Sequence, residues 1–447
     1  MTSDEAMPSI LVESAKIVMD DELTIANLLL EDGVIKRISK LKPFNRADVT
    51  IPANRLIALP GLIDAHVHLR DMELAYKETF QTGTRAAAAG GYTTVIDMPN
   101  TRPPTTNATR LAEKIAKAQG HIFTNMGFQG TLNPELEDII KMKQQGAIAF
   151  KLYLNKSLET FNASDESKLR LALHAAKRAN ALVTIHAEDG DAIKKSQAEC
   201  TASGRFTIRD FLRAHRPSVE IAAVRTILRL STKLHLRTHI CHITTPRAVQ
   251  LVYASGNSTC EATAHHLLLD YSAFSRFGTK ALCVPPIRRA EYRRDLWKLF
   301  VNGKINILAS DHAPHTLSEK VTKDAWKAAS GVPGLETSLR VMLTQVSRGR
   351  LSLSRLIRAS STLPAIIFRL PRKGRLQTGY DADIVLLDPK SKNTIRADKF
   401  LSKAKYSPFE GLKCTGKAIY TIVNGNIVYQ NGTVTDKAVG RILRSDN

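Results

Sequence analysis

The alternation of strand-like and helix-like segments through the middle of the chain is the feature that most constrains its fold. Eight short apolar segments alternate there with helix-compatible stretches. The segments are LIALPGLIDAHVHL (56–69), YTTVIDMP (92–99), HIFTNMGF (121–128), AIAFKLYL (147–154), LVTIHAED (182–189), LRTHICHIT (236–244), STCEATAHHL (258–267) and INILASDHA (305–313). Eight strand–helix units predict an α/β fold, a closed (β/α)8 TIM barrel. An open doubly wound sheet is the alternative, but no G-x-G-x-x-G follows the first strand.

The two ends of the chain resemble each other in pattern. Apolar segments flank the turn Asp32-Gly33 near the N-terminus and the turn Asn424-Gly425 near the C-terminus, and both patterns are typical of β-hairpins. Neither end is long enough to bury an apolar face alone. We therefore expect a small composite β-sandwich domain from residues 1–57 and 370–447, which flanks a barrel domain of residues 58–369.

Charge and composition limit the partners of the chain. The 447 residues include 64 Lys and Arg against 42 Asp and Glu, a formal charge of +22. These basic residues are spread along the chain without an arm, finger or RNP motif, so we expect no nucleic-acid partner. A positive surface also raises the encounter rate with an anionic substrate. Five scattered cysteines, no secretory signal and no membrane-length apolar stretch predict a cytoplasmic enzyme without a membrane partner.

Metal-ligand residue types stand near the ends of five of the predicted strands. Strand alternation puts both imidazoles of His66-Val67-His68 on one side, and the carboxyl ends of barrel strands converge on one face. The candidate ligands are His66, His68, Lys151, His186, His242 and Asp311. Imidazoles and a carboxylate suit two divalent ions, with zinc the first candidate. Because a free ammonium repels cations, Lys151 fits only if CO2 converts it to an anionic carbamate that bridges the ions.

Several longer motifs carry a resemblance to a known family. The motifs are GLIDAHVHLRD, GTRAAAAGGYTTVIDMPNT, HAED, HICHIT, ATAHHLLL, SDHAPH and GVPGLET. Together they resemble the class I dihydroorotases of the amidohydrolase superfamily, in an archaeal-type variant, from about Pro60 to Gly334. The terminal β-segments resemble the accessory domain of that superfamily. The resemblance implies a reversible cyclisation of N-carbamoyl-L-aspartate to (S)-dihydroorotate in pyrimidine synthesis.

The resemblance also implies a role for each matched position. His66 and His68 match the ligands of the first metal, His186 and His242 those of the second, and Lys151 the carbamylated bridge. Asp311 matches the first-metal ligand that shuttles the catalytic proton. The family residues that hold the substrate carboxylate are matched by Arg70, Asn100 and His315. An arginine offers that carboxylate a two-pronged hydrogen bond, and strand alternation puts Arg70 on the same face as His68.

Departures from the family pattern leave other functions open. Val284 stands where many relatives have Asn before Pro-Pro, and Asp71-Met72-Glu73 replaces Glu-Pro-Gly. Another cyclic-amide hydrolase, a hydantoinase or allantoinase, is the first alternative, although its substrate lacks the carboxylate that Arg70 would bind. A non-catalytic barrel that serves as an assembly partner is the second. We expect a homo-oligomer, and an aspartate transcarbamoylase is a candidate partner. The polar loop 153–167 is either an ordinary connection or a lid.

The other histidines are expected to be structural. His239 should face the outer helices, His312 should point away from the site, and His215 should lie at the surface or cap a helix. His265 and His266 close the seventh strand and are also expected to be structural. Cys241 is interpreted as a small buried hydrophobe. Three acidic positions near strand ends, which are Asp97, Glu188 and Asp189, are either partners of an imidazole or turn residues.

Overall fold

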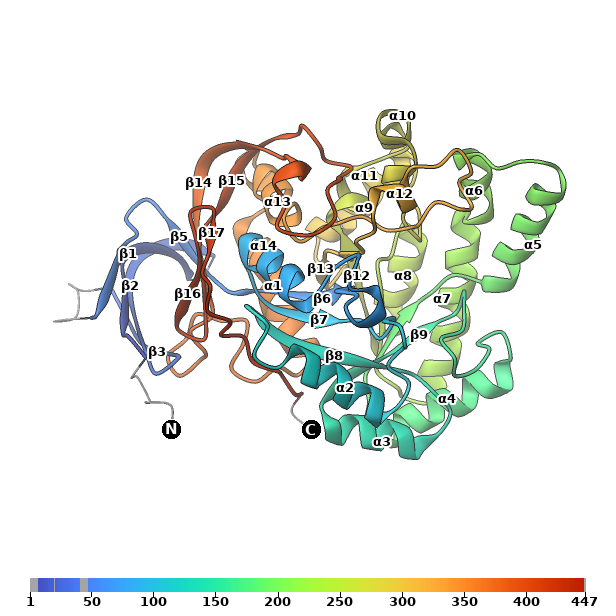
Figure 1. Ribbon diagram of the computed structural model, residues 1–447, viewed down its shortest axis with the longest axis horizontal. Helices are drawn as coiled ribbons and strands as arrows, with labels where there is room; N and C mark the ends of the chain where they lie inside the picture. The colour runs from blue at the N-terminus through green and yellow to red at the C-terminus, as the bar shows by residue number, and fades with distance from the viewer. Residues whose placement is uncertain (1–6, 20, 41–46, 446–447) are drawn as a thin grey trace.

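A computed structural model describes residues 7–19, 21–40 and 47–445, and it contains two β-sheets (Figure 1). The eight-stranded sheet runs in sequence order, and every paired neighbour in it is parallel. Its strands are β6 (Leu62–Val67), β7 (Tyr92–Asp97), β8 (Asn125–Thr131), β9 (Ala147–Tyr153), β10 (Val183–His186), β11 (Thr238–Ile240), β12 (Ser258–Thr263) and β13 (Ile307–Ala309). A parallel bridge between Val67 and His312 joins its two edges. The predicted (β/α)8 barrel is confirmed, with one barrel strand in each predicted segment; the first segment also contains a strand of the second sheet, Ile57–Pro60.

Helices follow most barrel strands and pack on the outside of the sheet. The α-helices are α1 (Phe80–Ala89), α2 (Ala108–Ala118), α3 (Leu136–Gln145), α4 (Glu166–Arg178), α5 (Gly190–Ala202), α6 (Ile208–Ala214), α7 (Pro217–Lys233), α8 (Pro246–Ser255), α9 (Ala264–Leu268), α10 (Ser272–Phe277), α11 (Ala290–Val301), α12 (Leu317–Lys320), α13 (Ser338–Ser347), α14 (Leu353–Ile357) and α15 (Leu363–Ile367). In α4 the side chain of Asp165 caps the first turn, and Leu169, Ala172 and Leu173 are buried. Their spacing of three and four residues is that of one helix face, which explains why this polar sequence packs as a helix.

Both ends of the chain build the second sheet. Its order is β17-β16-β15-β14-β5-β1-β2-β3, and β4 also pairs with β1. The strands are β1 (Ile10–Met19), β2 (Glu22–Glu31), β3 (Val34–Ser39), β4 (Val49–Pro52), β5 (Ile57–Pro60), β14 (Ile384–Thr394), β15 (Lys413–Val423), β16 (Asn426–Gln430) and β17 (Thr433–Val434). Strand β5 pairs with β1 on one side and with β14 on the other, so the two ends share one sheet and one apolar core.

The two hairpin turns of this sheet meet. Asp32, Gly33, Asn424 and Gly425 all have positive φ, which is typical of the two-residue type I′ hairpins that their sequences predicted. Ala382 lies between the turns: its amide donates to the carbonyl of Gly33, and its carbonyl accepts from the amide of Gly425 (2.8 and 2.9 Å). The N-terminal and C-terminal hairpins are therefore fastened to each other at their tips.

The final described residues return to the barrel. The amide of Met126 in β8 donates to the carbonyl of Arg441 at 2.9 Å, and the amide of Leu443 donates to the carbonyl of Met126 at 2.8 Å.

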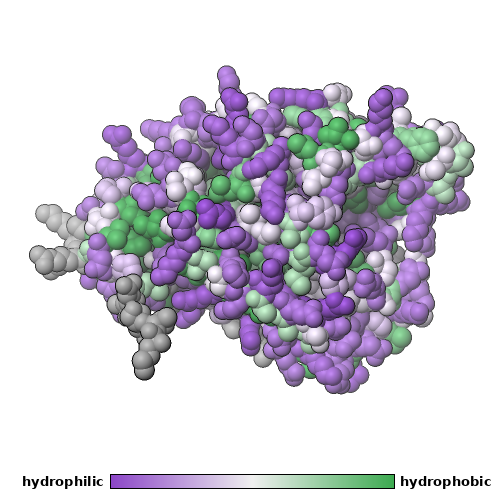
Figure 2. All heavy atoms as spheres, in the orientation of Figure 1, coloured by the Kyte–Doolittle hydropathy of each residue, from purple (hydrophilic) through white to green (hydrophobic). Residues whose placement is uncertain are grey.

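The face in view in Figure 2 is mainly hydrophilic. In the part of the chain that the structure describes, no helix has both the length and the apolar character needed to cross a membrane.

Candidate active site

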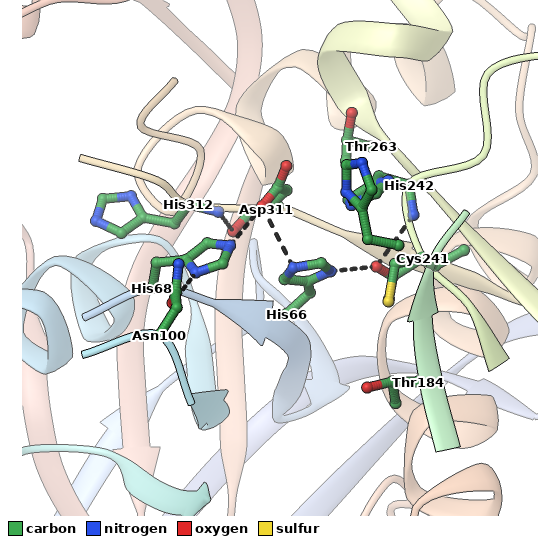
Figure 3. Close-up of polar contacts among 12 residues, drawn as sticks. His66, His68, Asn100, Thr184, Cys241, His242, Thr263, Asp311 and His312 are labelled. Atoms are coloured by element: carbon green, nitrogen blue, oxygen red, sulfur yellow. Dashed lines mark hydrogen bonds and ion pairs between the residues drawn. The ribbon is translucent and has the colours of Figure 1, made fainter. Parts of the chain in front are cut away.

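The carboxyl ends of β6 and β13 bring three of the predicted ligands together. His66 and His68 point toward Asp311, which follows β13 (Figure 3). The Nε2 atoms of His66 and His68 lie 3.4 and 3.1 Å from Oδ1 of Asp311. One ligand atom from each residue lies within 4.8 Å of the other two, which is the spacing of a shared metal ion.

Two further imidazoles adjoin this group. His186 ends β10 and His242 follows β11, and Nδ1 of His186 lies 3.1 Å from Nε2 of His242. The ring centroids of His66 and His242 are 5.2 Å apart, so the pair lies beside the first cluster. Four imidazoles from the carboxyl ends of three strands, β6, β10 and β11, and the residues just after them thus form one group.

Lys151 is fully buried in β9, and Nζ lies 3.0 Å from Sγ of Cys241. Among the described residues it forms no ion pair with a carboxylate. Burial is the largest cause that lowers the pKa of the four imidazoles. The positive charge of Lys151 lowers the pKa further in each of them, which are His66, His68, His186 and His242. This charge therefore acts on all four rings, as expected for a side chain placed between them.

The imidazoles are neutral, which is the form that binds metal ions. Burial lowers the pKa of His66 to about 4 and lowers that of His68 and His242 well below the usual range. Nε2 of His66 and Nδ1 of His242 are buried without a hydrogen-bond partner. Such a nitrogen costs about 1–3 kcal/mol when nothing satisfies it, and a divalent ion would. The residues present fit a pair of metal ions.

Glu261 in β12 holds the ring of His66, and its role was not predicted. One carboxylate oxygen lies 2.5 Å from Nδ1 of His66 and accepts the backbone amide of His242, and the other lies 3.1 Å from Nε2 of His239. Burial opposes ionisation, but the two imidazoles lower the pKa of Glu261. Its sequence signal is a carboxylate in the middle of a predicted barrel strand. The expectation that His239 faces the outer helices is wrong, because its ring shares this carboxylate with His66.

Glu188 holds the ring of His186 in the same way. Its two oxygens lie 2.8 Å from Nε2 of His186 and 2.9 Å from Nδ1 of His215. His215 caps the C-terminus of α6, as one of its two expected roles requires, but the surface position is wrong, since it is buried and stacks on Phe211. Glu188 is therefore a partner of an imidazole and not a turn residue. Asp189, in contrast, caps α5.

Asp97 and His312 lie near the site but outside the group of predicted ligands. Asp97 accepts the amide of Leu69 at 2.7 Å and pairs with Lys114 at 2.6 Å, so it fixes the segment after His68 and contacts no imidazole. His312 points away from His66, as expected, and its ring lies 3.4 Å from Glu78 (Figure 3).

Three site residues have left-handed backbone angles. The φ values of Arg70, His242 and Asp311 are 59°, 34° and 45°. A residue with a Cβ pays about 1–3 kcal/mol for such angles, and this cost concentrates at functional sites. The chain turns sharply just beyond β6, β11 and β13, which aims these side chains into the barrel mouth.

A cavity of about 330 Å³ opens above the ligands. Its walls include His66, His68, Arg70, Asn100, Tyr153, Asn155, Lys156, His186, His215, His242, Val284, Asp311, Ala313, His315, Ser330 and Gly331. All three predicted substrate-side residues line it together with five of the six predicted metal ligands. The volume suits a small molecule.

Arg70 is 7% exposed and lacks an acidic partner. Its Nε donates to the carbonyl of Pro314 at 3.3 Å, and Nη2 lies 3.2 Å from Nε2 of His315. Among the residues that the structure describes, no carboxylate forms an ion pair with this guanidinium. A buried cation without a counter-ion is costly, so the group is ready for an anionic ligand.

Asn100 and His315 flank this guanidinium. Oδ1 of Asn100 lies 2.7 Å from Nδ1 of His68, so its amide nitrogen is the atom available to donate toward a ligand. Nδ1 of His315 lies 3.1 Å from Nζ of Lys77. Burial, Arg70 and Lys77 lower the pKa of His315 far below its usual range, so the ring beside Arg70 is neutral.

The loop 153–167 forms one wall of the cavity. Lys156 is exposed as a residue, but its ammonium group lies in the cavity, 4.8 Å from the ring centroid of Tyr153. Burial of that group and the charge of Arg70 lower the pKa of Lys156 to about 8. The opposite wall includes Val284, so the position where many relatives have Asn presents an apolar side chain.

Comparison with known proteins places this site in a family. The model of the Amidohydrolase family matches residues 57–428, and the chain belongs to that family. The chain is 39% identical to a dihydroorotase of Methanothermobacter thermautotrophicus, over 94% of each chain. It is 36% identical to a dihydroorotase of Methanosphaera stadtmanae, over 92% of this chain and 94% of the relative. The solved structure of an L-hydantoinase (dihydropyrimidinase) from Arthrobacter aurescens has a TM-score of 0.94 at 33% identity, over 98% of this chain and all of that one.

These relatives define the reaction class. Their names are those of enzymes that open or close cyclic amides, and the likeness extends over nearly the whole chain. The protein is a cyclic amidohydrolase.

Proposed function

We propose that this protein is a dihydroorotase, which interconverts N-carbamoyl-L-aspartate and (S)-dihydroorotate in pyrimidine synthesis. The observation that carries the proposal is the buried guanidinium of Arg70, which pairs with no carboxylate of the described residues and shares a cavity with the metal ligands. Both molecules keep a carboxylate that takes no part in the reaction. The planar fork of Arg70 matches that carboxylate, and the amide of Asn100 can donate beside it.

The charge of the cavity supports an anionic substrate. Arg70 and Lys156 both line it, and Asp311 is the one carboxylate among its lining residues. A hydantoin ring carries no carboxylate and would leave Arg70 unpaired in the enzyme–substrate complex. This cost is the physical reason to favour dihydroorotate over a hydantoin.

The ligand set fits two divalent ions, with zinc the first candidate. His66, His68 and Asp311 would hold one ion, and His186 and His242 the other. When bound, such ions make water nucleophilic at neutral pH and polarise the scissile carbonyl. Glu261 and Glu188 orient the rings of His66 and His186 through their other nitrogens.

Lys151 supports a carbamate at the centre of the site. As an ammonium it is a fully buried charge without a carboxylate partner, next to four imidazoles that must bind cations. Reaction of Nζ with CO2 replaces this charge by an anion, which removes the repulsion and adds two oxygen ligands.

Asp311 is placed to move the proton. Its Oδ1 lies toward His66 and His68, so Oδ2 is the atom that accepts a proton from water and passes it to the leaving ring nitrogen. Ring closure consumes a proton and releases water, and ring opening is the reverse. Acid therefore favours cyclisation, and alkali favours hydrolysis.

One assay tests the substrate assignment. The metal-replete protein is given dihydroorotate, hydantoin and allantoin side by side, and we expect turnover of dihydroorotate to exceed the others by at least the worth of one buried charged hydrogen bond, about 2–3 kcal/mol. The likeness to an L-hydantoinase makes a hydantoinase the second candidate. Faster turnover of hydantoin would establish that second function and refute the first.

A further inference from the structure

A second group of metal-ligand side chains lies beside the catalytic centre. His265 and His266 open α9 directly after β12, and Cys283 lies between the short turn at Gly278–Ala281 and Pro285. The three residues are 2%, 3% and 1% exposed. One ligand atom from each lies within 4.8 Å of the other two. None of the three belongs to the catalytic ligand set.

The distances within this group resemble those around a tetrahedral ion. Sγ of Cys283 lies 3.7 Å from Nε2 of His266 and 3.3 Å from the carbonyl oxygen of Pro285, and that oxygen lies 2.9 Å from Nε2 of His266. Zinc bonds to sulfur and nitrogen place neighbouring ligand atoms roughly 3.3–3.6 Å apart in a tetrahedron. The Cys283–His266 and Cys283–Pro285 separations are close to this spacing, and the 2.9 Å hydrogen-bond distance between Nε2 of His266 and the carbonyl oxygen would have to widen when an ion binds.

His265 supplies the independent observation. Its Nε2 atom is buried and has no hydrogen-bond partner. A cluster held by hydrogen bonds alone leaves this nitrogen unsatisfied, at a cost of about 1–3 kcal/mol. An ion bound among these side chains through this nitrogen would satisfy it.

Thr263 can set the tautomer of His266 that binding requires. Its Oγ1 atom lies 2.9 Å from Nδ1 of His266. When Nδ1–H donates to this hydroxyl, the electron pair of Nε2 faces Cys283. Metal-bound histidines commonly have such a partner on the opposite nitrogen.

We propose that His265, His266, Cys283 and the carbonyl oxygen of Pro285 form a third metal site, closed to solvent, for one borderline or soft ion such as zinc. On binding, a metal–sulfur bond forms, the S–H bond of Cys283 breaks, and its proton leaves to solvent. The site would tie the start of α9 to the segment that carries Val284, which lines the catalytic cavity. It is independent of the substrate.

Cobalt alone is the probe. The full-length protein is stripped of metal, reconstituted with Co²⁺ and freed of excess ion, and cobalt per chain and the absorption spectrum are recorded. We expect three cobalt ions per chain and a near-ultraviolet thiolate-to-cobalt charge-transfer band. Cys283→Ser should remove the band and one cobalt ion while two remain. Cys200→Ser is the matched control, since Cys200 is equally buried in α5 and should leave both readouts unchanged.

A third cysteine variant separates the two centres. Cys241 adjoins Lys151 in the catalytic group, so Cys241→Ser must retain the band if the thiolate belongs to Cys283. Loss of the band in Cys241→Ser overturns the proposal, as does a native protein with two cobalt ions and no band. If Cys283→Ser does not fold, His265→Gln keeps the test decisive: it should hold cobalt at the third site at least ten-fold more weakly, and unchanged affinity overturns the proposal.

Discussion

The mouth of the barrel and the terminal β-sheet differ in whether local sequence preference agrees with the tertiary structure. In the sheet, local preference and tertiary structure agree: Asp32-Gly33 and Asn424-Gly425 adopt the turns that their sequences favour, over an apolar core. At the mouth they conflict, because Arg70 and the amine of Lys151 are both buried and neither pairs with a carboxylate among the described residues. Such conflicts persist where function requires them. The sheet is therefore built for stability, and the mouth for binding ions.

The largest effect should come from Lys151. Lys151→Ala should abolish activity and reduce bound metal, because the bridging ligand is lost, and short carboxylic acids should partly restore both. Stability of the metal-free protein should not fall, since no ion pair is broken. Metal analysis, kcat and the free energy of unfolding are the measurements.

Lys114 is the matched control for this contrast. It is equally buried but pairs with Asp97, so Lys114→Met should lower the free energy of unfolding by about 3–5 kcal/mol. Equal changes in the free energy of unfolding of Lys151→Ala and Lys114→Met would contradict the contrast between the barrel mouth and the rest of the fold.

Asp311→Asn should come next. The amide keeps the shape but accepts no proton, so the rate should fall by about 10²–10⁴-fold while metal content is retained. Cyclisation and hydrolysis should fall together, because both use one proton path. Assays in the two directions alongside metal analysis check this. Loss of one direction alone would assign the proton to another group, with His315 the first to test.

Arg70 should have a smaller effect that depends on substrate. Arg70→Ala should lower kcat/KM for dihydroorotate by about 2–4 kcal/mol at unchanged metal content. Arg70→Lys keeps the charge without the fork and should also lose activity. Activity toward a neutral cyclic amide should be spared, and a stability measurement should show no loss. Normal turnover of dihydroorotate by Arg70→Ala would refute the substrate proposal.

The sequence predicted the ligands better than their supports. Period and composition identify all eight strands, and convergence of their ends predicts that His66, His186 and Asp311 meet. The prediction for His239 assumed that the alternation of side chains along the strand continues as far as His242. Strand β11 ends at Ile240 and His242 has a φ of 34°, so the alternation stops before His242 and the prediction for His239 failed.

Contacts that depend on how distant segments pack could not be read from local patterns. Glu261 reaches His66 across 195 residues, and Glu188 reaches His215 across 27. His215 is buried where α6 meets α7, although the charged residues Arg213 and Arg216 lie close to it in the sequence. No periodicity within one segment encodes either pairing.

The smallest predicted effect is a loss of stability at the two hairpin turns that meet in the terminal sheet. It tests whether local preference and tertiary structure agree there. Gly425 has φ of 78°, and a Cβ there would lie 3.0 Å from the Cα of Gly33. Gly256, which ends α8, has φ of 72° and nothing within 4 Å of such a Cβ. Ala at either position pays about 1–2 kcal/mol for the left-handed angle. Gly425→Ala should pay more, because the backbone of Gly33 must also shift. Denaturant unfolding of the two variants measures the difference, and kcat and bound metal should match the native values in both. Equal destabilisation would mean that the close approach of the two turns adds nothing to the cost of a side chain at Gly425.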